Sequence, residues 1–461
     1  MLISIDDYHP AADGQTLDTA HFQRALDDIA AKGGGILYVP PGPYLIGSLT
    51  LSANLTLHLA AGATLIASSR AEDYSLQTQS QAECSTRALL YAFGQKNITI
   101  EGKGRIDGNA SAWFAAEADA MGYRLPLPQR PRMLVLEACR QVTLQDFTIE
   151  QAPMWTIHLV SCEQVRIARL CVDNDLTMAN SDALDIDSCR YVHISDSYFS
   201  AADDGICIKT TQKPAPLRGP AAHIIITGTI LRSNSCALKI GTETWDDIED
   251  VVVTGCTIID SNRGIGLLSR DGGRFRRLSF SHITFNCIYA PPVHWGKADP
   301  VFISVRPRHP EVTPGEIAWV QFSHLIGSTQ GAINLHCEIP GALHHISFAH
   351  LLIEQLPSDH PEQGWYDIRP PCNPANPGGV GLDNAYAINP ATERPWGVEA
   401  WPGGMPGLFA QGVTALSLRE VQINRPEPLP AGWHPQTIVE RSWLTSERFQ
   451  MGGEAGIVAH R

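Results

Sequence analysis

Acidic side chains gather in two short segments near the middle of the chain. The segment NSDALDIDSC carries Asp182, Asp185 and Asp187, and the following segment ADDGICIK carries the adjacent pair Asp203 and Asp204. Carboxylates held close together repel one another, which raises the pKa of at least one and separates a proton donor from a proton acceptor. Glycoside hydrolysis needs this division, with one protonated carboxyl at the leaving oxygen and one carboxylate for water or the anomeric carbon.

Two other interpretations of these aspartates stay open on spacing alone. Aspartate is common in the turns of repeat proteins, because it caps turns and tolerates unusual backbone dihedrals. Clustered carboxylates also bind hard cations such as Ca²⁺. The spacing is therefore compatible with a catalytic cluster, a set of turn residues or a calcium site.

Several polar and aromatic residues fall at comparable positions of neighbouring segments and could contact a substrate. Each also has a structural interpretation: an exposed strand position for the histidine, charge neutralisation for the cations, and packing for the tryptophan. Arg270 precedes Asp271 and two glycines, which is typical of a turn with an internal ion pair. The candidate substrate-binding residues are Asn180, Asp185, His158, Lys209, Lys239, Arg263, Arg270 and Trp295.

The elements that must position these residues are short strands in a repeat. Strands such as VRIARLCV at Val165 and VHISDSYF at Val192 begin 27 residues apart, a period typical of solenoids. A larger gap, from Leu278 to Val320, predicts loop insertions on one face. The repeat favours one solenoid domain over residues 1–461, because 461 residues exceed what a single compact core usually supports.

A second set of strands runs in phase with the first and has apolar residues at its third and fifth positions. Strand alternation points those two positions inward and their neighbours outward. The fold class predicted is all-β, with stacked coils of parallel strands. The inward rows are Ile157, Leu184, Ile206, Leu238, Ile265 and Ile333, then Leu159, Ile186, Ile208, Ile240, Leu267 and Leu335.

Two segments depart from the repeat. Residues 18–32 have the pattern of an amphipathic helix, with Asp18 as N-cap and Gly33 to Gly35 as its stop, and we expect this helix to cap the solenoid. Residues 355–412 are rich in Pro, Gly and Trp, which predicts a long irregular loop region.

Composition limits the possible cellular compartments and the possible classes of binding partner. The net charge of −14 argues against nucleic acid, because phosphate binding needs basic surfaces. Eleven cysteines without paired spacing fit a reducing compartment. The first residues show no signal-peptide pattern and no apolar stretch is long enough to span a bilayer, so we expect a cytoplasmic protein with no membrane partner. Nothing in the sequence indicates an oligomeric state.

The two aspartate segments resemble the paired Asn-Thr-Asp-Gly and Gly-Asp-Asp signature of glycoside hydrolase family 28, the polygalacturonases and their relatives. The segments ADGQTLDTAHFQRAL, GGGILYVPPGPYLIGSLTL and GRIDGNASAWF agree, so the resemblance covers residues 12–353. It implies a right-handed parallel β-helix and hydrolysis with inversion, without a cofactor or a metal. It also implies that Asp203 is the general acid and that Asp182 and Asp204 hold and activate the attacking water.

Two departures from the family pattern concern the substrate. Cys236 stands where family members have the His of a Gly-His-Gly element, and Gly266 and Leu268 replace the charged residues of an Arg-Ile-Lys element. The aspartates are kept while the usual clamp for an acidic sugar is lost. Lys239, Arg263 or Arg270 could supply a replacement cation, or the sugar at the cleavage site could be neutral, such as rhamnose or galactose.

The sequence therefore predicts an inverting glycosidase that acts on pectin-related oligosaccharides of the galacturonide or rhamnogalacturonan type. The long loops suggest a pocket and exo action. The alternatives are an exo-glycosidase on a neutral sugar, a polysaccharide lyase on the same solenoid, and a carbohydrate-binding β-helix without catalysis.

Overall fold

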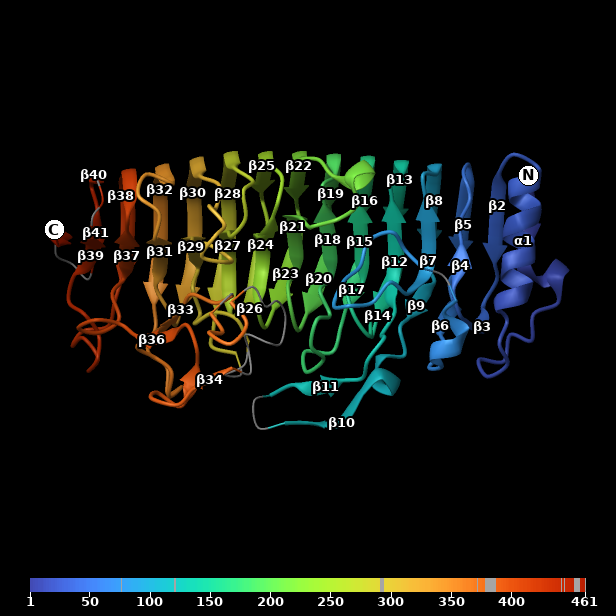
Figure 1. Cartoon of the computed structure of the whole chain (residues 1–461), viewed down its shortest axis with the longest axis horizontal. Coiled ribbons are helices and arrows are strands. Elements are labelled where there is room, and N and C mark those ends of the chain that lie inside the picture. The colour runs from blue at the N-terminus through green and yellow to red at the C-terminus, as the bar shows by residue number, and fades with distance from the viewer. Residues whose placement is uncertain are drawn as a thin grey trace. The chain divides into compact units, whose positions relative to one another are not determined.

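The computed structural model describes residues 1–75, 77–119, 122–290, 294–370, 372–377, 387–440, 442, 444–451 and 457–460. Within these residues the chain is mostly short parallel strands, with one α-helix near the N-terminus (Figure 1). They form two compact units, residues 1–206 with 212–225 and residues 207–211 with 226–461. The single domain expected over residues 1–461 stays a prediction. No helix among the described residues is long and apolar enough to cross a membrane.

The first unit contains strands of two long parallel sheets. One sheet takes β1 (Leu2–Ser4), β2 (Gly35–Val39), β3 (Gly42–Ile46), β5 (Leu55–Leu59), β6 (Ala63–Ala67), β8 (Lys96–Gly102), β9 (Arg105–Asp107), β13 (Arg140–Gln145), β14 (Thr148–Glu150), β16 (Glu163–Ala168), β17 (Cys171–Asp173), β19 (Arg190–Ser195) and β20 (Tyr198–Ala201). The other takes β4 (Leu49–Thr50), β7 (Ala88–Phe93), β12 (Arg132–Glu137), β15 (Ile157–Val160) and β18 (Leu184–Asp187).

The second unit repeats this arrangement. Its first sheet takes β23 (Ile230–Ser233), β25 (Ile248–Thr254), β26 (Thr257–Ser261), β28 (Phe275–Cys287), β30 (Ile317–Thr329), β32 (Leu343–Gln355), β38 (Val413–Asn424), β40 (Leu444–Glu447) and β41 (Gln450–Met451). Its other sheet takes β24 (Cys236–Thr244), β27 (Arg263–Ser269), β29 (Val301–Val305), β31 (Ile333–Cys337), β37 (Leu408–Gln411), β39 (Thr437–Glu440) and β42 (Ile457–His460). Strands β21 (Ile206–Thr210) and β22 (Ala221–Thr227) include residues of both units.

Consecutive coils pair strand for strand. In the first unit β13, β14 and β15 pair in parallel with β16, β17 and β18. Arg140 pairs with Glu163, and Glu163 with Arg190, so these two coils are 23 and 27 residues long (163 − 140 and 190 − 163). This is the geometry of a parallel β-helix, and the predicted fold class is confirmed.

The inward aliphatic rows stack as predicted. Ile157 pairs with Leu184 and Leu159 with Ile186, and all four side chains are buried. The second unit also holds strands that the repeat did not reveal, among them β29, which pairs with both β27 and β31. It lies in the gap from Leu278 to Val320, which we interpreted as loop alone. Its sequence VFISV has the right alternation, but the spacing to the next strand hides it.

Many bends of the coil are made by residues other than glycine. Asp146, Arg169 and Asp196 occupy the same bend in three successive coils, with φ of 69°, 54° and 53°. This left-handed conformation costs free energy for residues with a Cβ, and aspartate tolerates it better than most. Arg169 and Lys103 both form ion pairs with Asp146, so neighbouring bends also interact through their side chains.

The predicted helix forms as α1 (Thr19–Ala31), and Gly33 and Gly34 follow it with φ of 84° and 129°. Asp18 lies at the N-cap position, but its carboxylate does not cap the helix. It accepts instead from the backbone N–H groups of Ala11 and Ala12, at 2.7 and 3.1 Å. The start of the helix was therefore predicted correctly, but capping by the Asp18 side chain is not its cause.

Antiparallel hairpins interrupt the coils. The first unit carries β10 (Phe114–Ala118) with β11 (Arg124–Pro126). The expected loop region 355–412 includes β33 (Trp365–Asp367) with β36 (Val398–Ala400), and β34 (Ile388–Asn389) with β35 (Arg394–Pro395). It also holds β37 of the long sheet, so it is less irregular than its composition suggested. Residues 371 and 378–386 of that region lie outside the described part.

Candidate active site

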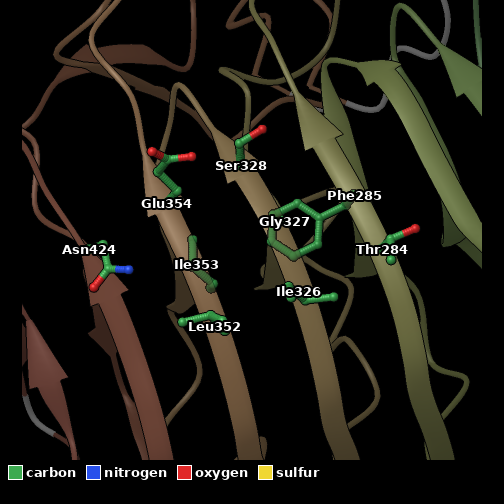
Figure 2. A pocket seen from close by; sticks show the side chains of 9 residues that line it. All are labelled: Thr284, Phe285, Ile326, Gly327, Ser328, Leu352, Ile353, Glu354 and Asn424. Atoms are coloured by element: carbon green, nitrogen blue, oxygen red, sulfur yellow. The ribbon is translucent and has the colours of Figure 1, made fainter.

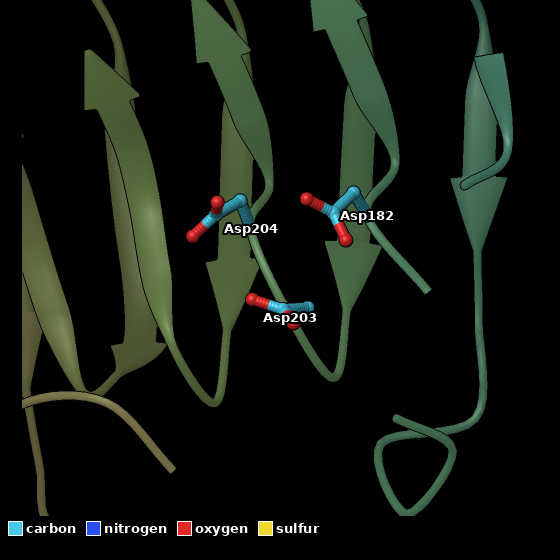
Figure 3. Close-up of side chains that lie close together, drawn as sticks. All are labelled: Asp182, Asp203 and Asp204. Atoms are coloured by element: carbon cyan, nitrogen blue, oxygen red, sulfur yellow. The ribbon is translucent and has the colours of Figure 1, made fainter. Parts of the chain in front are cut away.

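Three aspartates of the first unit converge at the edge of the coil. Asp182 lies just before β18, and Asp203 and Asp204 follow β20 in the next coil (Figure 3). One carboxylate oxygen of each lies within 4.8 Å of the others. The side chains are nearly buried, with exposed fractions of 3% for Asp182, 8% for Asp203 and 1% for Asp204.

Backbone hydrogen bonds between neighbouring coils hold the three aspartates close together. The N–H of Thr156 donates to the carbonyl of Asp182, and the N–H of Ala183 donates to the carbonyl of Asp204, at 2.8 and 3.0 Å. The hydroxyl of Ser181 also accepts from the N–H of Ala202 at 3.2 Å. The aspartates are thus placed by the same hydrogen bonds that hold adjacent coils together, which is why their sequence spacing predicted their contact.

A gap of this size suits a bound water. A water that donates two hydrogen bonds of about 2.8 Å spans roughly 4.4 Å between its acceptor oxygens. The trio is therefore spaced to hold one water between two carboxylates. The same oxygens could instead surround a hard cation, so within the described residues the calcium interpretation concerns this trio.

Arg130 adjoins this group and was not selected from the sequence. Its guanidinium donates to Oδ1 of Asn180 at 2.9 Å and to the carbonyl of Ala179 at 2.8 Å. Asn180 is 3% exposed and lies two residues before Asp182. Arg130 lies outside the repeat, between a hairpin strand and β12, so no periodic signal could have identified it.

His158 is fully buried, which corrects its interpretation as an exposed strand position. Its Nδ1 lies 2.7 Å from the Arg132 guanidinium, and its Nε2 lies 3.5 Å from the Asp187 carboxylate. Asp187 in turn accepts from Lys213 at 2.5 Å. A side chain enclosed in this way positions its neighbours and has no surface for a sugar. Asp185, another candidate, is also fully buried.

The pKa of the Asp187 carboxyl is shifted by these buried charged neighbours. Burial alone would raise the pKa of Asp187, but the charge of Lys213 and the hydrogen bond with His158 outweigh it and hold that pKa well below its usual range. Burial also lowers the pKa of Arg132, to about 10, against the opposing charges of Glu137 and Asp185. Asp187 therefore stays ionised in the folded protein.

Two candidate cations belong to the second unit and pair with a common carboxylate. Lys209 is 2% exposed and lies 3.9 Å from Glu243, while Lys239 is 9% exposed. Burial would raise the pKa of Glu243, but the charges of Lys209, Arg308 and Lys239 lower it. Sequence reasoning selected the lysines and missed Glu243, which lies four residues after Lys239 near the end of β24.

The other two candidate cations, Arg263 and Arg270, contact a strap formed by residues 365–370 with Cys372. Arg263 donates to the carbonyl of Asp367 at 2.5 Å, and Arg270 to the carbonyl of Pro370 at 2.6 Å. Both guanidinium groups are at most 1% exposed. Arg270 does not pair with Asp271 as its sequence suggested, because Asp271 accepts from Arg308 instead. Both arginines are engaged with the strap, and their role in substrate binding stays a prediction.

The role of Trp295 as a platform for a sugar ring also stays a prediction. It is 6% exposed, and the Arg369 guanidinium lies 4.9 Å from the centre of its ring. Arg369 itself forms an ion pair with Asp367 at 2.7 Å. The tryptophan therefore packs beneath the strap.

The two departures from the expected family pattern meet in one contact. A Cβ on Gly266 would lie 2.9 Å from Sγ of Cys236, closer than van der Waals contact allows. Cys236 is buried and donates to the carbonyl of Leu238 at 3.1 Å. Cys236 therefore occupies space that a larger residue at position 266 would need.

A groove on the second unit has a different character. It lies over β28, β30, β32 and β38, and Phe285, Ile326 and Leu352 form its apolar part (Figure 2). Gly327 keeps it open, because a Cβ there would meet the carbonyl oxygen of Phe285 at 2.0 Å. Ile326 and Leu352 are 48% and 42% exposed. The groove contains none of the candidate residues.

Comparison with known proteins gives one family and a consistent fold. The model of glycosyl hydrolases family 28 matches residues 36–338. The chain is 26% identical over 277 residues to a probable polygalacturonase of Vitis vinifera, a match over 57% of this chain and 56% of the relative. It is 24% identical over 311 residues to the exo-poly-alpha-D-galacturonosidase of Dickeya chrysanthemi, over 57% and 51%. The chain thus spans about half the length of these curated relatives.

Solved structures resemble nearly the whole chain. An exopolygalacturonase of Thermotoga maritima matches with a TM-score of 0.66 and 19% identity, over 98% of this chain and 92% of that one. A family 28 exopolygalacturonase of Yersinia enterocolitica matches with a TM-score of 0.70 and 16% identity, over 98% and 77%. At these identities the likeness establishes the fold.

Proposed function

Because this chain belongs to glycosyl hydrolases family 28, we propose that it hydrolyses glycosidic bonds in pectin-related oligosaccharides. The observation that carries the proposal is the convergence of Asp182, Asp203 and Asp204 within 4.8 Å at the edge of the coil. Like charges this close cannot all ionise freely, which supports one protonated acid beside two carboxylates.

The proposed roles follow from exposure and from the family pattern. Asp203 has the largest exposed fraction of the three, 8%, and donates its proton to the leaving oxygen. Asp182 and Asp204 accept the hydrogens of one water and direct its oxygen at the anomeric carbon. When the bond breaks, the proton lost by the water passes to a carboxylate of this pair, while Asp203 becomes ionised.

Inversion is the part of the proposal that the carboxylate spacing does not favour by itself. Most inverting enzymes keep their carboxyl groups about 6.5–9.5 Å apart, and retaining enzymes about 5–5.5 Å. The oxygens here approach within 4.8 Å. The proposal of inversion therefore rests on the family pattern and on a water held by two carboxylates at once.

We propose a uronide-containing substrate and exo action. Relatives named as polygalacturonase and as exo-poly-alpha-D-galacturonosidase support this. The β10–β11 hairpin is an insertion of the kind that closes a cleft into a pocket. A neutral sugar is the second candidate, supported by the small residues Cys236 and Gly266 where the family has charged ones.

The first experiment measures products from oligogalacturonides, rhamnogalacturonan fragments and neutral oligosaccharides, with chelator present and with NMR detection of the first anomer released. We expect a monosaccharide of inverted configuration from the acidic panel. A product of retained configuration would contradict the proposed roles of the aspartates. An unsaturated product that disappears with chelator would indicate a lyase.

Variants test the roles separately. Asp203→Asn should lower kcat by about 10³-fold or more while the protein still folds, because an amide cannot donate the proton. Asp185→Asn is the matched control for removal of a nearby charge. A carbohydrate-binding protein without catalysis would bind the same oligosaccharides equally well before and after Asp203→Asn and would release no product from either.

We also propose that the protein works in a reducing compartment such as the cytoplasm. The eleven cysteines show no paired spacing in the sequence, and most of them are buried. Cell fractionation with an antibody against the chain tests this location.

A further inference from the structure

Arg130 connects three segments that meet beside Asp182. Nη1 donates to the carbonyl oxygens of Pro153 and Ala179, at 3.0 and 2.8 Å, and Nη2 donates to Oδ1 of Asn180 at 2.9 Å. The side chain is 6% exposed, and its guanidinium lies 5.1 Å from the centre of the Phe114 ring. A planar fork with five donors can make such contacts together, and a lysine cannot.

The contact acts on an unusual stretch of backbone. Asn180 has φ of 58°, the left-handed region, and precedes Asp182 by two residues. Between them, Ser181 accepts from the N–H of Ala202 in the coil that carries Asp203. The chain at Asp182 is therefore held by Arg130 on one side and by the next coil on the other.

Arg130 also interacts electrostatically with Asp182. Burial lowers the pKa of Arg130 to about 10, while the negative charges of Glu83 and Asp182 oppose this. Arg130 stays a cation at neutral pH and attracts the ionised form of Asp182. Burying a cation costs free energy. Packing alone therefore does not explain why Arg130 lies next to the loop that carries Asp182.

We propose that Arg130 is a positioning residue for the reaction: its fork fixes the left-handed turn at Asn180 and so aims the Asp182 carboxylate at the attacking water. Arg130 does not touch the reacting atoms in this scheme. The inference rests on the proposed hydrolase function, because it assigns Arg130 to the same three aspartates.

A merely structural role is the competing explanation, since the β10–β11 hairpin lies beside this loop. Backbone hydrogen bonds also tie that hairpin to the loop, as the N–H of Arg124 donates to the carbonyl of Thr177 at 2.8 Å. The Arg124 side chain donates to the carbonyl of Ala115 within the hairpin, at 2.7 Å, and does not contact Asn180. Arg124→Gln is therefore a matched control that perturbs the hairpin and spares the catalytic loop.

The test compares kcat and KM of Arg130→Gln, Arg130→Lys and Arg124→Gln on the substrate that the wild type cleaves. We expect Arg130→Gln and Arg130→Lys to lose roughly 10- to 100-fold in kcat with KM changed by less than about threefold. Arg124→Gln should keep the wild-type kcat. A kcat of Arg130→Gln within about twofold of wild type, or full activity of Arg130→Lys, would overturn the proposal.

A second variant covers the case in which Arg130→Gln does not fold. Asn180→Gly keeps the left-handed turn accessible but removes the partner of Arg130, and should lose kcat to a similar extent. The double variant with Arg130→Lys should lose little more than either single one, because both remove the same contact. Additive losses would contradict the proposed coupling.

Failure of the inference and failure of the proposed function give different results. If the wild type is active and Asp203→Asn is not, the hydrolase function stands whatever Arg130 does. If the wild type releases no product, the proposed function fails and the inference fails with it.

Discussion

The buried charges around Asp187 make the stability of the first unit depend on pH. The carboxylate of Asp187 pairs with Lys213 and faces His158, and its pKa in the folded protein lies well below the unfolded value of about 3.9. A depressed pKa contributes stability that is present above the unfolded pKa and is lost as pH falls toward the folded one. The salt bridge therefore stabilises the fold at neutral pH and not in acid.

We predict that the melting temperature falls progressively as the pH drops below about 5, and most steeply below the unfolded pKa of about 3.9, because Asp187 gains a proton on unfolding. Asp187→Asn should be less stable than wild type at pH 7, because it leaves Lys213 buried without its charge partner, and should show a weaker dependence on pH. Differential scanning calorimetry across this range measures both. An unchanged pH dependence in Asp187→Asn would show that other carboxylates control acid unfolding.

At the residue scale, the sequence predicted which aspartates meet but not what surrounds them. Asp182 and Asp204 were predictable because strand pairing converts a one-coil separation into contact. The burial of His158, Arg263 and Arg270 was not expected, because an outward position on a strand is usually exposed. The residues that contact these side chains can be distant in sequence. Arg270 donates to the carbonyl oxygens of Ile368 and Pro370, which lie about a hundred residues away.

At the scale of elements, the left-handed bends are the feature most open to a test. Asp196 makes the bend between β19 and β20, is exposed, and has φ of 53°. Its backbone conformation favours glycine and penalises branched side chains.

We predict that Asp196→Gly changes the free energy of unfolding by less than about 0.5 kcal/mol, while Asp196→Val lowers it by about 1–2 kcal/mol. Asp196→Asn serves as the control, since asparagine tolerates the same bend. Urea unfolding of the three variants gives the comparison. Equal stability of the valine and glycine variants would exclude backbone strain at this bend.

The elements themselves were largely predictable, and the exceptions have a physical cause. The helix and the aliphatic rows follow from periodicity, which depends only on local sequence. The strand β29 was missed because insertions on both sides disturb its spacing. The left-handed bends at Asp146, Arg169 and Asp196 were not predicted, because these residues share a backbone conformation without sharing a residue type.

At the scale of the whole molecule, charge opposes the proposed substrate. The chain has a formal net charge of −14, and an anionic oligosaccharide approaching it is repelled beyond the immediate contacts. Salt screens this repulsion over about 10 Å at 0.1 M.

We predict that kcat/KM for an acidic oligosaccharide rises severalfold between about 10 mM and 150 mM salt, while that for a neutral oligosaccharide stays constant. Initial rates at low substrate concentration measure this directly. A fall with added salt would mean that local cations, rather than the net charge, control the encounter.

Pairing between neighbouring coils has a further consequence for how the protein is made. Asp182 and Asp203 are 21 residues apart (203 − 182), so the active site closes through a loop far shorter than the chain. Contacts of short sequence separation form fast, because little chain entropy is lost in closing them. During synthesis the aspartates can meet as soon as their two coils have left the ribosome, before the last two hundred residues are translated. Errors in the C-terminal coils would then act on a site that has already been assembled.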